Sequence, residues 1–119
     1  MTIKDCYARI AGDFDGVMSR LMTEARVEKF AMRFLDDTTL KDFNEAFAKG
    51  DITTSFRAAH TLKGVASNLG FTELYTTASA VTEDLRDGNP SNDINALVEK
   101  MNESYKKVAA ALTTYKMLL

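Results

Sequence analysis

Apolar residues recur along most of this chain at the spacing typical of amphipathic helices, and the pattern is clearest towards its end. From residue 94 onwards they are three or four positions apart, which places them along one face of a helix. This stripe consists of Ile94, Leu97, Val98, Met101, Tyr105, Val108, Leu112 and Tyr115. Ser91 or Asn92 is a suitable N-terminal cap. The pattern predicts a long helix that buries a single face.

Three more helices of the same kind are predicted before it. They end near Gly50, Gly70 and Gly88, because glycine commonly terminates a helix, and Asp51 is a suitable cap for the second of them. Their apolar stripes are Leu40, Phe43 and Phe47 in the first, Ala58, Leu62, Val65 and Leu69 with Ala59 and Ala66 on the flank in the second, and Leu74, Ala78, Val81 and Leu85 in the third.

The first third of the chain has a less regular pattern, because glycines and aspartates interrupt it around residues 12–16. We predict two or three shorter helices there. No stretch alternates apolar and polar residues as a half-buried strand does, and helices with short connections pack as antiparallel neighbours. We therefore expect an all-α fold in one domain, residues 1–119. Residues 38–119 would form an up-and-down four-helix bundle, and residues 1–37 would supply additional N-terminal helices packed across it.

Length and charge narrow the classes of function. A chain of 119 residues suits one domain. Its 15 Lys and Arg against 17 Asp and Glu give a formal net charge of −2, so no basic field is available to bind nucleic acid. No run approaches the roughly 20 apolar residues of a membrane helix, and the first residues do not resemble a signal peptide. We expect a cytoplasmic protein that binds neither nucleic acid nor membranes.

The chain has a single cysteine, Cys6, and a single histidine, His60. One cysteine excludes an internal disulfide, a CxxC redox pair and a multi-cysteine zinc site, and we expect Cys6 to be a small buried hydrophobic residue. One histidine with one distant cysteine is not a convincing ligand set for a metal or haem. We predict that this domain binds no cofactor and no metal.

His60 lies on a helix whose polar side is unusual. At about 100° per residue, Lys63, Gly64 and Ser67 all fall within roughly 60° of His60, whereas Leu62 points to the opposite side. His60 therefore faces outwards. A glycine inside a helix costs about 1 kcal/mol relative to alanine, so Gly64 requires a functional or packing reason. An exposed imidazole, a neighbouring cation and an unobstructed approach describe a site that carries a phosphoryl group.

The same residues also allow less specific interpretations. An isolated histidine on a helix is usually a solvated surface residue, and a lysine beside it is usually part of a charged face. A glycine can equally allow two helices to pack closely. An enzyme that uses His60 as a general base would need a cleft and a carboxylate or nucleophile partner, and no such set is visible in the sequence.

The segment AAHTLKGVASNLG, residues 58–70, resembles the signature of histidine-containing phosphotransfer (HPt) domains, which reads approximately HxLKG followed by a small residue and a later glycine. The flanking residues resemble the family's neighbouring helices, so the resemblance covers most of residues 38–88. It implies that His60 accepts a phosphoryl group and that Lys63 steadies the phosphoryl oxygens. It also implies that Gly64 gives the partner access and that Ser67 adds a hydrogen bond.

The resemblance implies a phosphocarrier rather than a stand-alone enzyme. His60 would accept the phosphoryl group from a receiver-domain aspartate, or from a histidine kinase, and transfer it to another response-regulator receiver aspartate. Mg²⁺ and the acidic pocket would belong to the receiver, and a hybrid sensor histidine kinase is a further expected partner. The alternative is a non-catalytic helical-bundle scaffold, a degenerate HPt-like module, although the intact His60, Lys63 and Gly64 argue against it.

The surface that docks a receiver and the residue that supports the His60 ring are also predicted. Docking of a receiver would use exposed apolar residues near the histidine: Phe56, one turn before it, with Thr61 at the edge, the open surface at Gly64, and Met18 and Met22 on the N-terminal segment. Phe56 could equally form a contact between helices, and methionines in such positions are more often part of the core. Some HPt domains support the histidine with a glutamine on the following helix, and this chain contains no glutamine. Ser79, Thr82 or Glu83 would fill that space here.

Overall fold

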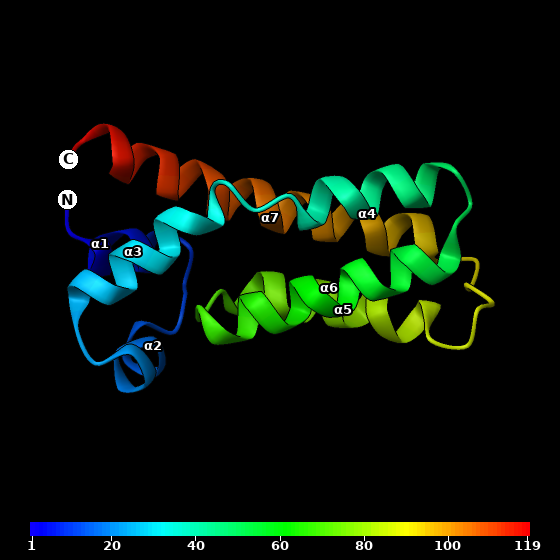
Figure 1. Cartoon of the computed structure of the whole chain (residues 1–119), viewed down its shortest axis with the longest axis horizontal. Helices are drawn as coiled ribbons and strands as arrows, with labels where there is room; N and C mark the ends of the chain where they lie inside the picture. Colours follow the sequence, from blue (N-terminus) through cyan, green and yellow to red (C-terminus); the bar gives the residue numbers. More distant parts are fainter.

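The computed structural model describes all residues, 1–119, as seven α-helices joined by turns, without any strand. The helices are α1 (Ile3–Arg9), α2 (Phe14–Leu21), α3 (Glu24–Phe34), α4 (Thr39–Ala48), α5 (Ile52–Asn68), α6 (Thr72–Leu85) and α7 (Ile94–Met117) (Figure 1). The predicted all-α fold is confirmed, and the first third of the chain contains three short helices.

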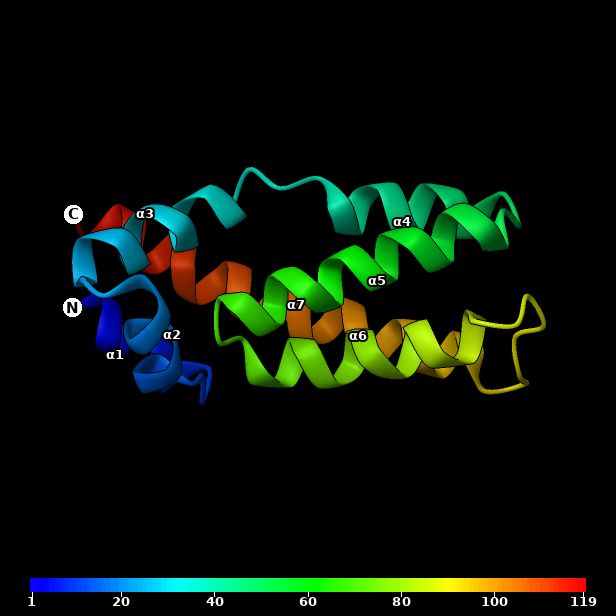
Figure 2. The ribbon, with the colours of Figure 1, turned by 60° about the horizontal axis from the view of Figure 1, so that its bottom comes forward.

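Helices α4 to α7 form the predicted up-and-down bundle. Consecutive helices of this set pack against each other, and α5 packs most extensively against α6. Figure 2 shows α5 and α6 side by side, with α7 running along the length of the molecule. The side-chain amides of Asn44 on α4 and Asn102 on α7 exchange hydrogen bonds of 2.9 and 3.2 Å. These amides join the first and last helices of the bundle.

The three N-terminal helices pack at one end of the bundle, where α1 and α3 contact the C-terminal part of α7 (Figure 1). Hydrogen bonds from two buried tyrosines hold them there. The hydroxyl of Tyr7 on α1 donates to the carbonyl of Leu69 at the end of α5 (2.6 Å), and that of Tyr115 on α7 donates to the carboxylate of Glu28 on α3 (2.8 Å). One continuous core includes buried side chains from all seven helices, and Cys6 is buried in it as predicted.

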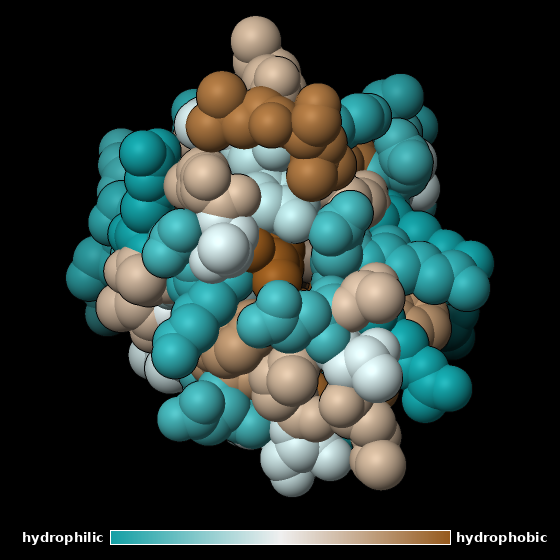
Figure 3. Space-filling model, turned by 90° about the vertical axis from the view of Figure 1, so that its left-hand side faces the viewer, coloured by the Kyte–Doolittle hydropathy of each residue, from teal (hydrophilic) through white to brown (hydrophobic).

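The end of the molecule that carries both chain termini is mostly polar, with a group of apolar side chains near its upper edge in Figure 3. Three C-terminal residues, Met117, Leu118 and Leu119, are exposed. None of the helices combines the length and the apolar character that a membrane span requires.

The buried face of α5 is rotated relative to the predicted stripe. Leu62 and Leu69 are buried as expected, but Ala59 and Ala66 are fully buried while Ala58 and Val65 are only half-buried. Helix α5 packs against both α4 and α6, and the side of α5 that these two neighbours enclose together is the side that becomes buried. The prediction placed these alanines on the flank because spacing alone does not show where the neighbouring helices pack.

Helix ends agree with the sequence in most places. The carboxylate of Asp51 accepts from the Thr54 amide (3.1 Å) and caps α5. Gly70 has a φ of +71°, and a Cβ there would meet the Asp13 carbonyl at 2.7 Å. The predicted cap of α7 is wrong, because the helix starts after Asp93 without a side-chain cap. The Ser91 hydroxyl accepts instead from the Asp93 amide (3.2 Å), within the turn.

Candidate functional site

His60 lies in the middle of α5, on its exposed face. The helix register that buries Leu62 and Ala59 turns the imidazole towards solvent, because the exposed and buried sets are about half a turn apart. Phe56 one turn before His60, and Gly64 and Ser67 beyond it, share this side. The local order of residues along α5 is therefore sufficient to bring the predicted histidine, lysine, glycine and serine together.

The imidazole of His60 stacks on an aromatic ring that also contacts a guanidinium group. The Phe56 ring stacks on the imidazole with centroids 6.1 Å apart and planes 22° apart. On the Phe56 ring lies the guanidinium of Arg86 from α6, 5.3 Å from the centroid. Phe56 is half-buried and packs against the core. It therefore supports His60 from the fold as well as contributing to the exposed face.

Lys63 lies three residues after His60 on the same helix, and the other cation of α5, Arg57, lies three residues before it. Lys63 is half-buried, and its ammonium lies 6.0 Å from the ring centroid of Tyr75 on α6. Lysine can keep its charged end in solvent while its methylene chain covers apolar surface. Lys63 is thus placed on the α6 side of His60, with no carboxylate in an ion pair with it.

Gly64 is exposed, and a Cβ built at this position would have no other atom within 4 Å. The glycine is therefore not needed for close packing between helices of this chain. This finding removes the packing explanation that the sequence left open. What remains is that Gly64 keeps the surface next to His60 free of a side chain.

Ser67 is exposed near the end of α5, seven residues or about 10 Å along the helix from His60. Its carbonyl accepts from the guanidinium of Arg20 on α2 (3.0 Å), as does the carbonyl of Asn68 (3.0 Å). The Ser67 carbonyl also accepts from the Gly70 amide (3.2 Å), so Arg20 adds a second hydrogen bond there and a side-chain partner for the Asn68 carbonyl at the helix end. Arg20 also fixes α2 beside the C-terminal end of α5.

The remaining predicted docking residues are spread over two helices. Thr61 is exposed on α5 next to His60. Met22 follows α2 and is 72% exposed, whereas Met18 is half-buried against the core. Both methionines lie on the segment that Arg20 fixes beside the end of α5, so the structure places them near Ser67 rather than beside the imidazole.

A groove between α3 and α5, which the sequence did not predict, lies next to the predicted docking residues. One part, of about 240 Å³, is lined by Phe30, Arg33, Val65, Asn68 and other residues. A second part, of about 340 Å³, extends towards Arg20 and Leu21 of α2. The guanidinium of Arg33 lies 5.3 Å from the Phe30 ring centroid. The available signal was the Phe30–Arg33 spacing of three, which puts both side chains on one face of a helix.

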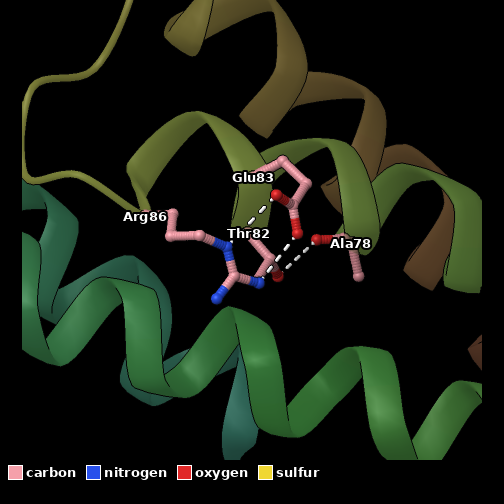
Figure 4. Close-up of polar contacts among 4 residues, drawn as sticks. All are labelled: Ala78, Thr82, Glu83 and Arg86. Carbon is pink, nitrogen blue, oxygen red and sulfur yellow. Dashed lines mark hydrogen bonds and ion pairs between the residues drawn. The ribbon is translucent and has the colours of Figure 1, made fainter.

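The helix that follows, α6, faces this site with a stripe spaced by three and four residues: Tyr75, Ser79, Glu83 and Arg86. Of the three residues expected to replace a glutamine, Thr82 is fully buried and donates to the Ala78 carbonyl (2.7 Å). Glu83 accepts two hydrogen bonds from Arg86 (Figure 4). The Ser79 hydroxyl is buried and has no hydrogen-bond partner. Of the three residues, Ser79 is therefore the one whose side chain makes no hydrogen bond.

The carboxylate of Glu83 is held ionised by the cations around it. The hydrogen bonds from Arg86 lower its pKa most, and the charges of Arg86, Lys63 and His60 lower the pKa further. No group of three or more His, Cys, Asp or Glu side chains is arranged to hold a metal ion. The chemistry available at the site is that of one exposed imidazole between cationic neighbours.

Comparison with known proteins gives one match. The sequence model of a family described as Hpt domain matches residues 34–112, about two thirds of the chain. The matched region contains α4 to α6, most of α7 and every predicted site residue except Met18 and Met22. Comparisons with curated proteins and with solved structures gave no match.

Proposed function

Because the chain belongs to the Hpt domain family, we propose that it is a phosphocarrier of a two-component phosphorelay in which His60 is the phosphoryl acceptor. The donor is a receiver-domain aspartyl phosphate or a histidine kinase, and the recipient is the aspartate of another response-regulator receiver. The observation that carries this proposal is the exposed imidazole of His60 beside Lys63 and the open surface at Gly64.

In the proposed transfer, the lone pair of an unprotonated imidazole nitrogen forms the N–P bond while the O–P bond to the donor aspartate breaks. The aspartate leaves as a carboxylate, and the other ring nitrogen keeps its proton. Onward transfer reverses these roles with the next aspartate. Phosphoryl transfer depends mainly on positioning and on charge stabilisation. Phe56 supports the ring, and the ammonium of Lys63, three residues beyond His60 on the same helix, would stabilise phosphoryl oxygens.

The proposal assigns Mg²⁺ and the acidic pocket to the receiver, since the residues around His60 include no metal-binding group of carboxylates. Receiver domains are the proposed partners, and a hybrid sensor histidine kinase is a further proposed partner. The docking surface would be centred on Thr61 and Gly64, with Phe56 at one side. The α3–α5 groove and the exposed Met22 would extend it towards α2.

The deciding experiment is incubation with a phosphorylated receiver and Mg²⁺, followed by intact mass measurement of wild type and His60→Gln. We expect one phosphoryl group, labile to acid and stable to base, on the wild type and none on the variant. Because His60 is exposed, circular dichroism and thermal unfolding of the variant should match the wild type. A phosphorylated His60→Gln variant, or no transfer to folded wild type from several receivers, would contradict the proposal, and the latter would favour the scaffold alternative.

A further inference from the structure

A carboxylate and a guanidinium from α6 lie on the α6 side of His60. Glu83 and Arg86 form a two-point ion pair, with Nε to Oε2 at 3.1 Å and Nη2 to Oε1 at 2.8 Å. The same guanidinium lies over the Phe56 ring, which in turn stacks on His60. Figure 4 shows both side chains projecting from α6 towards α5. Contact with Phe56 therefore links the ion pair to the ring that stacks on His60.

The ion pair has little structural value where it stands. Its two side chains are 52% and 59% exposed and are three residues apart on one helix, and exposed pairs of this kind contribute little to stability. The position of the ion pair has a larger effect on the balance of charges around His60 than on the stability of the fold. Lys63 and Arg86 are the cations in contact with aromatic rings on the α6 side of the site, and Arg57 lies three residues before His60 on α5. Among the carboxylates with a resolved pKa shift, Glu83 is the one whose pKa the charge of His60 lowers.

We propose that Glu83 and Arg86 set the phosphoryl-transfer potential of His60, Glu83 by repelling the phosphoryl group and Arg86 by attracting it. This inference rests on the function proposed above. A phosphoryl group adds about two negative charges. The phosphoryl group on His60 would compete with the Glu83 carboxylate for the positive charges of Arg86 and Lys63. The negative charge of Glu83 would also repel the phosphoryl group. Phosphohistidine is therefore kept easy to discharge onto the next aspartate.

The proposal predicts opposite effects for the two members of the pair. Glu83→Gln removes the repulsion and releases Arg86 to the phosphoryl group, so phosphohistidine becomes more stable. Arg86→Gln leaves Glu83 without its partner, so phosphohistidine becomes less stable. A purely structural ion pair behaves differently, because both substitutions break the same contact and shift any property in the same direction. The sign of the two effects separates these explanations.

The test compares wild type, Glu83→Gln, Arg86→Gln and the double variant. The matched control is Glu73→Gln, which makes the same charge change on α6 but breaks an exposed ion pair with Lys107 of α7 (3.1 Å). Each protein is equilibrated at low concentration with a phosphorylated receiver and Mg²⁺, and the phosphorylated fractions are measured by intact mass. Docking contacts change the rates of forward and reverse transfer by the same factor. The equilibrium constant therefore depends only on the stabilities of the phosphorylated and unphosphorylated forms of the two separate proteins.

We expect the equilibrium constant for His60 phosphorylation to rise about two- to fivefold in Glu83→Gln and to fall by a similar factor in Arg86→Gln, the upper part of the range typical of exposed charge pairs. The double variant should lie between them, and Glu73→Gln should match wild type. Equal shifts in the same direction, or no shift in either single variant, would overturn the proposal. Thermal unfolding checks that all variants are folded.

A second measurement separates this inference from the proposed function. Phosphoramidate, a small phosphoryl donor, loads histidine without a receiver, and the loss of the phosphoryl group to water is then followed by mass. We expect slower hydrolysis in Glu83→Gln and faster hydrolysis in Arg86→Gln. If no receiver transfers to His60 but these rates differ as expected, the phosphorelay function fails while the charge effect stands. Identical hydrolysis rates would contradict the charge effect even where receivers transfer normally.

Discussion

The imidazole of His60 stacks on the ring of Phe56 one helical turn before it, with centroids 6.1 Å apart and planes inclined by 22°. Phe56 is itself packed against the core, so the stack links the exposed histidine to the rigid interior. The sequence pattern left Phe56 open between a docking surface and a contact between helices. The structure adds a further use for it, because the ring limits the positions that the imidazole can adopt.

Phe56→Leu should slow phosphoryl transfer to His60 about three- to tenfold, because an aromatic pair contributes roughly 0.5–1.5 kcal/mol beyond the burial of its surface. Leucine keeps most of the apolar volume but loses the stack. The measurement is the rate of transfer from a phosphorylated receiver. Phe47→Leu is the matched control, since Phe47 is also half-buried and stacks on Phe43 at 5.6 Å. Equal slowing in both variants would show that lost stability, and not the stack, limits transfer.

Gly64→Ala should stabilise the fold while Gly64→Leu should block transfer. The Cβ has free space around it, and alanine is better than glycine in a helix by about 1 kcal/mol, which corresponds to a rise of about 4 °C in the thermal midpoint. Gly64→Leu should also remain folded but slow transfer more than about tenfold, because the side chain occupies the surface that a receiver approaches.

Asn95→Leu is the control for Gly64→Leu, because it adds a leucine to an exposed position of α7. Its transfer rate should match wild type. Normal transfer by Gly64→Leu would remove the steric explanation for the glycine. A fall in thermal midpoint in Gly64→Ala would show that the helix is strained at this position.

Ser79→Ala should leave stability unchanged or raise it by up to about 1 kcal/mol, because it removes a buried hydroxyl that has no hydrogen-bond partner. Thr82→Val is the contrasting variant. It removes a buried hydroxyl that donates to the Ala78 carbonyl, and it should cost about 1 kcal/mol. Chemical denaturation of both variants measures the difference. A loss of stability in Ser79→Ala as large as that in Thr82→Val would mean that the Ser79 hydroxyl does have a partner.

From the raised pKa of Tyr115 we predict that the free energy of unfolding decreases at alkaline pH. Burial, and then the Glu28 carboxylate that accepts its hydroxyl, raise the pKa of Tyr115 to about 12, whereas an unfolded tyrosine titrates near about 10. Between these values the folded protein keeps a proton that the unfolded chain has lost. The stabilisation is therefore fully present below about pH 10 and is lost as pH rises towards 12.

Tyr115→Phe tests this relationship. The variant should be less stable at neutral pH by about 1 kcal/mol, because it loses the hydrogen bond. Its free energy of unfolding should fall less steeply between about pH 10 and 12. Burial also raises the pKa of Tyr7, so part of the alkaline slope should remain. A slope identical to that of wild type would contradict the assignment to Tyr115.

Helix periodicity was sufficient to predict that the bundle helices exist, but it did not predict which side of each helix is buried. α5, α6 and α7 are 14 to 24 residues long, so their stripes repeat often enough to be recognised, and glycines mark several of their ends. α1 and α2 have 7 and 8 residues, too few repeats for firm bounds. The rotation of α5 that buries Ala59 and Ala66 was missed because it depends on where the neighbouring helices pack.

The interhelical part of the site was not predictable in the same way. Tyr75, Ser79, Glu83 and Arg86 are visible as a spaced stripe on α6, but the spacing does not say that it faces His60. The groove of Phe30 and Arg33 likewise needs the position of α3 beside α5. From the sequence, Thr82, Ser79 and Glu83 were equal candidates to support His60. The structure shows that Thr82 is buried and that its hydroxyl donates to the Ala78 carbonyl of the same helix.

The sequence by itself determined that His60, Lys63, Gly64 and Ser67 share one exposed side of a helix, because the register of an α-helix depends only on local spacing. Only the tertiary structure decided which groups from other helices meet that side. The packing of α6 on α5 brings Arg86 over Phe56, and the Arg20 side chain fixes α2 at the end of α5. These contacts join residues far apart in sequence, so they depend on how whole helices bury their apolar faces against each other.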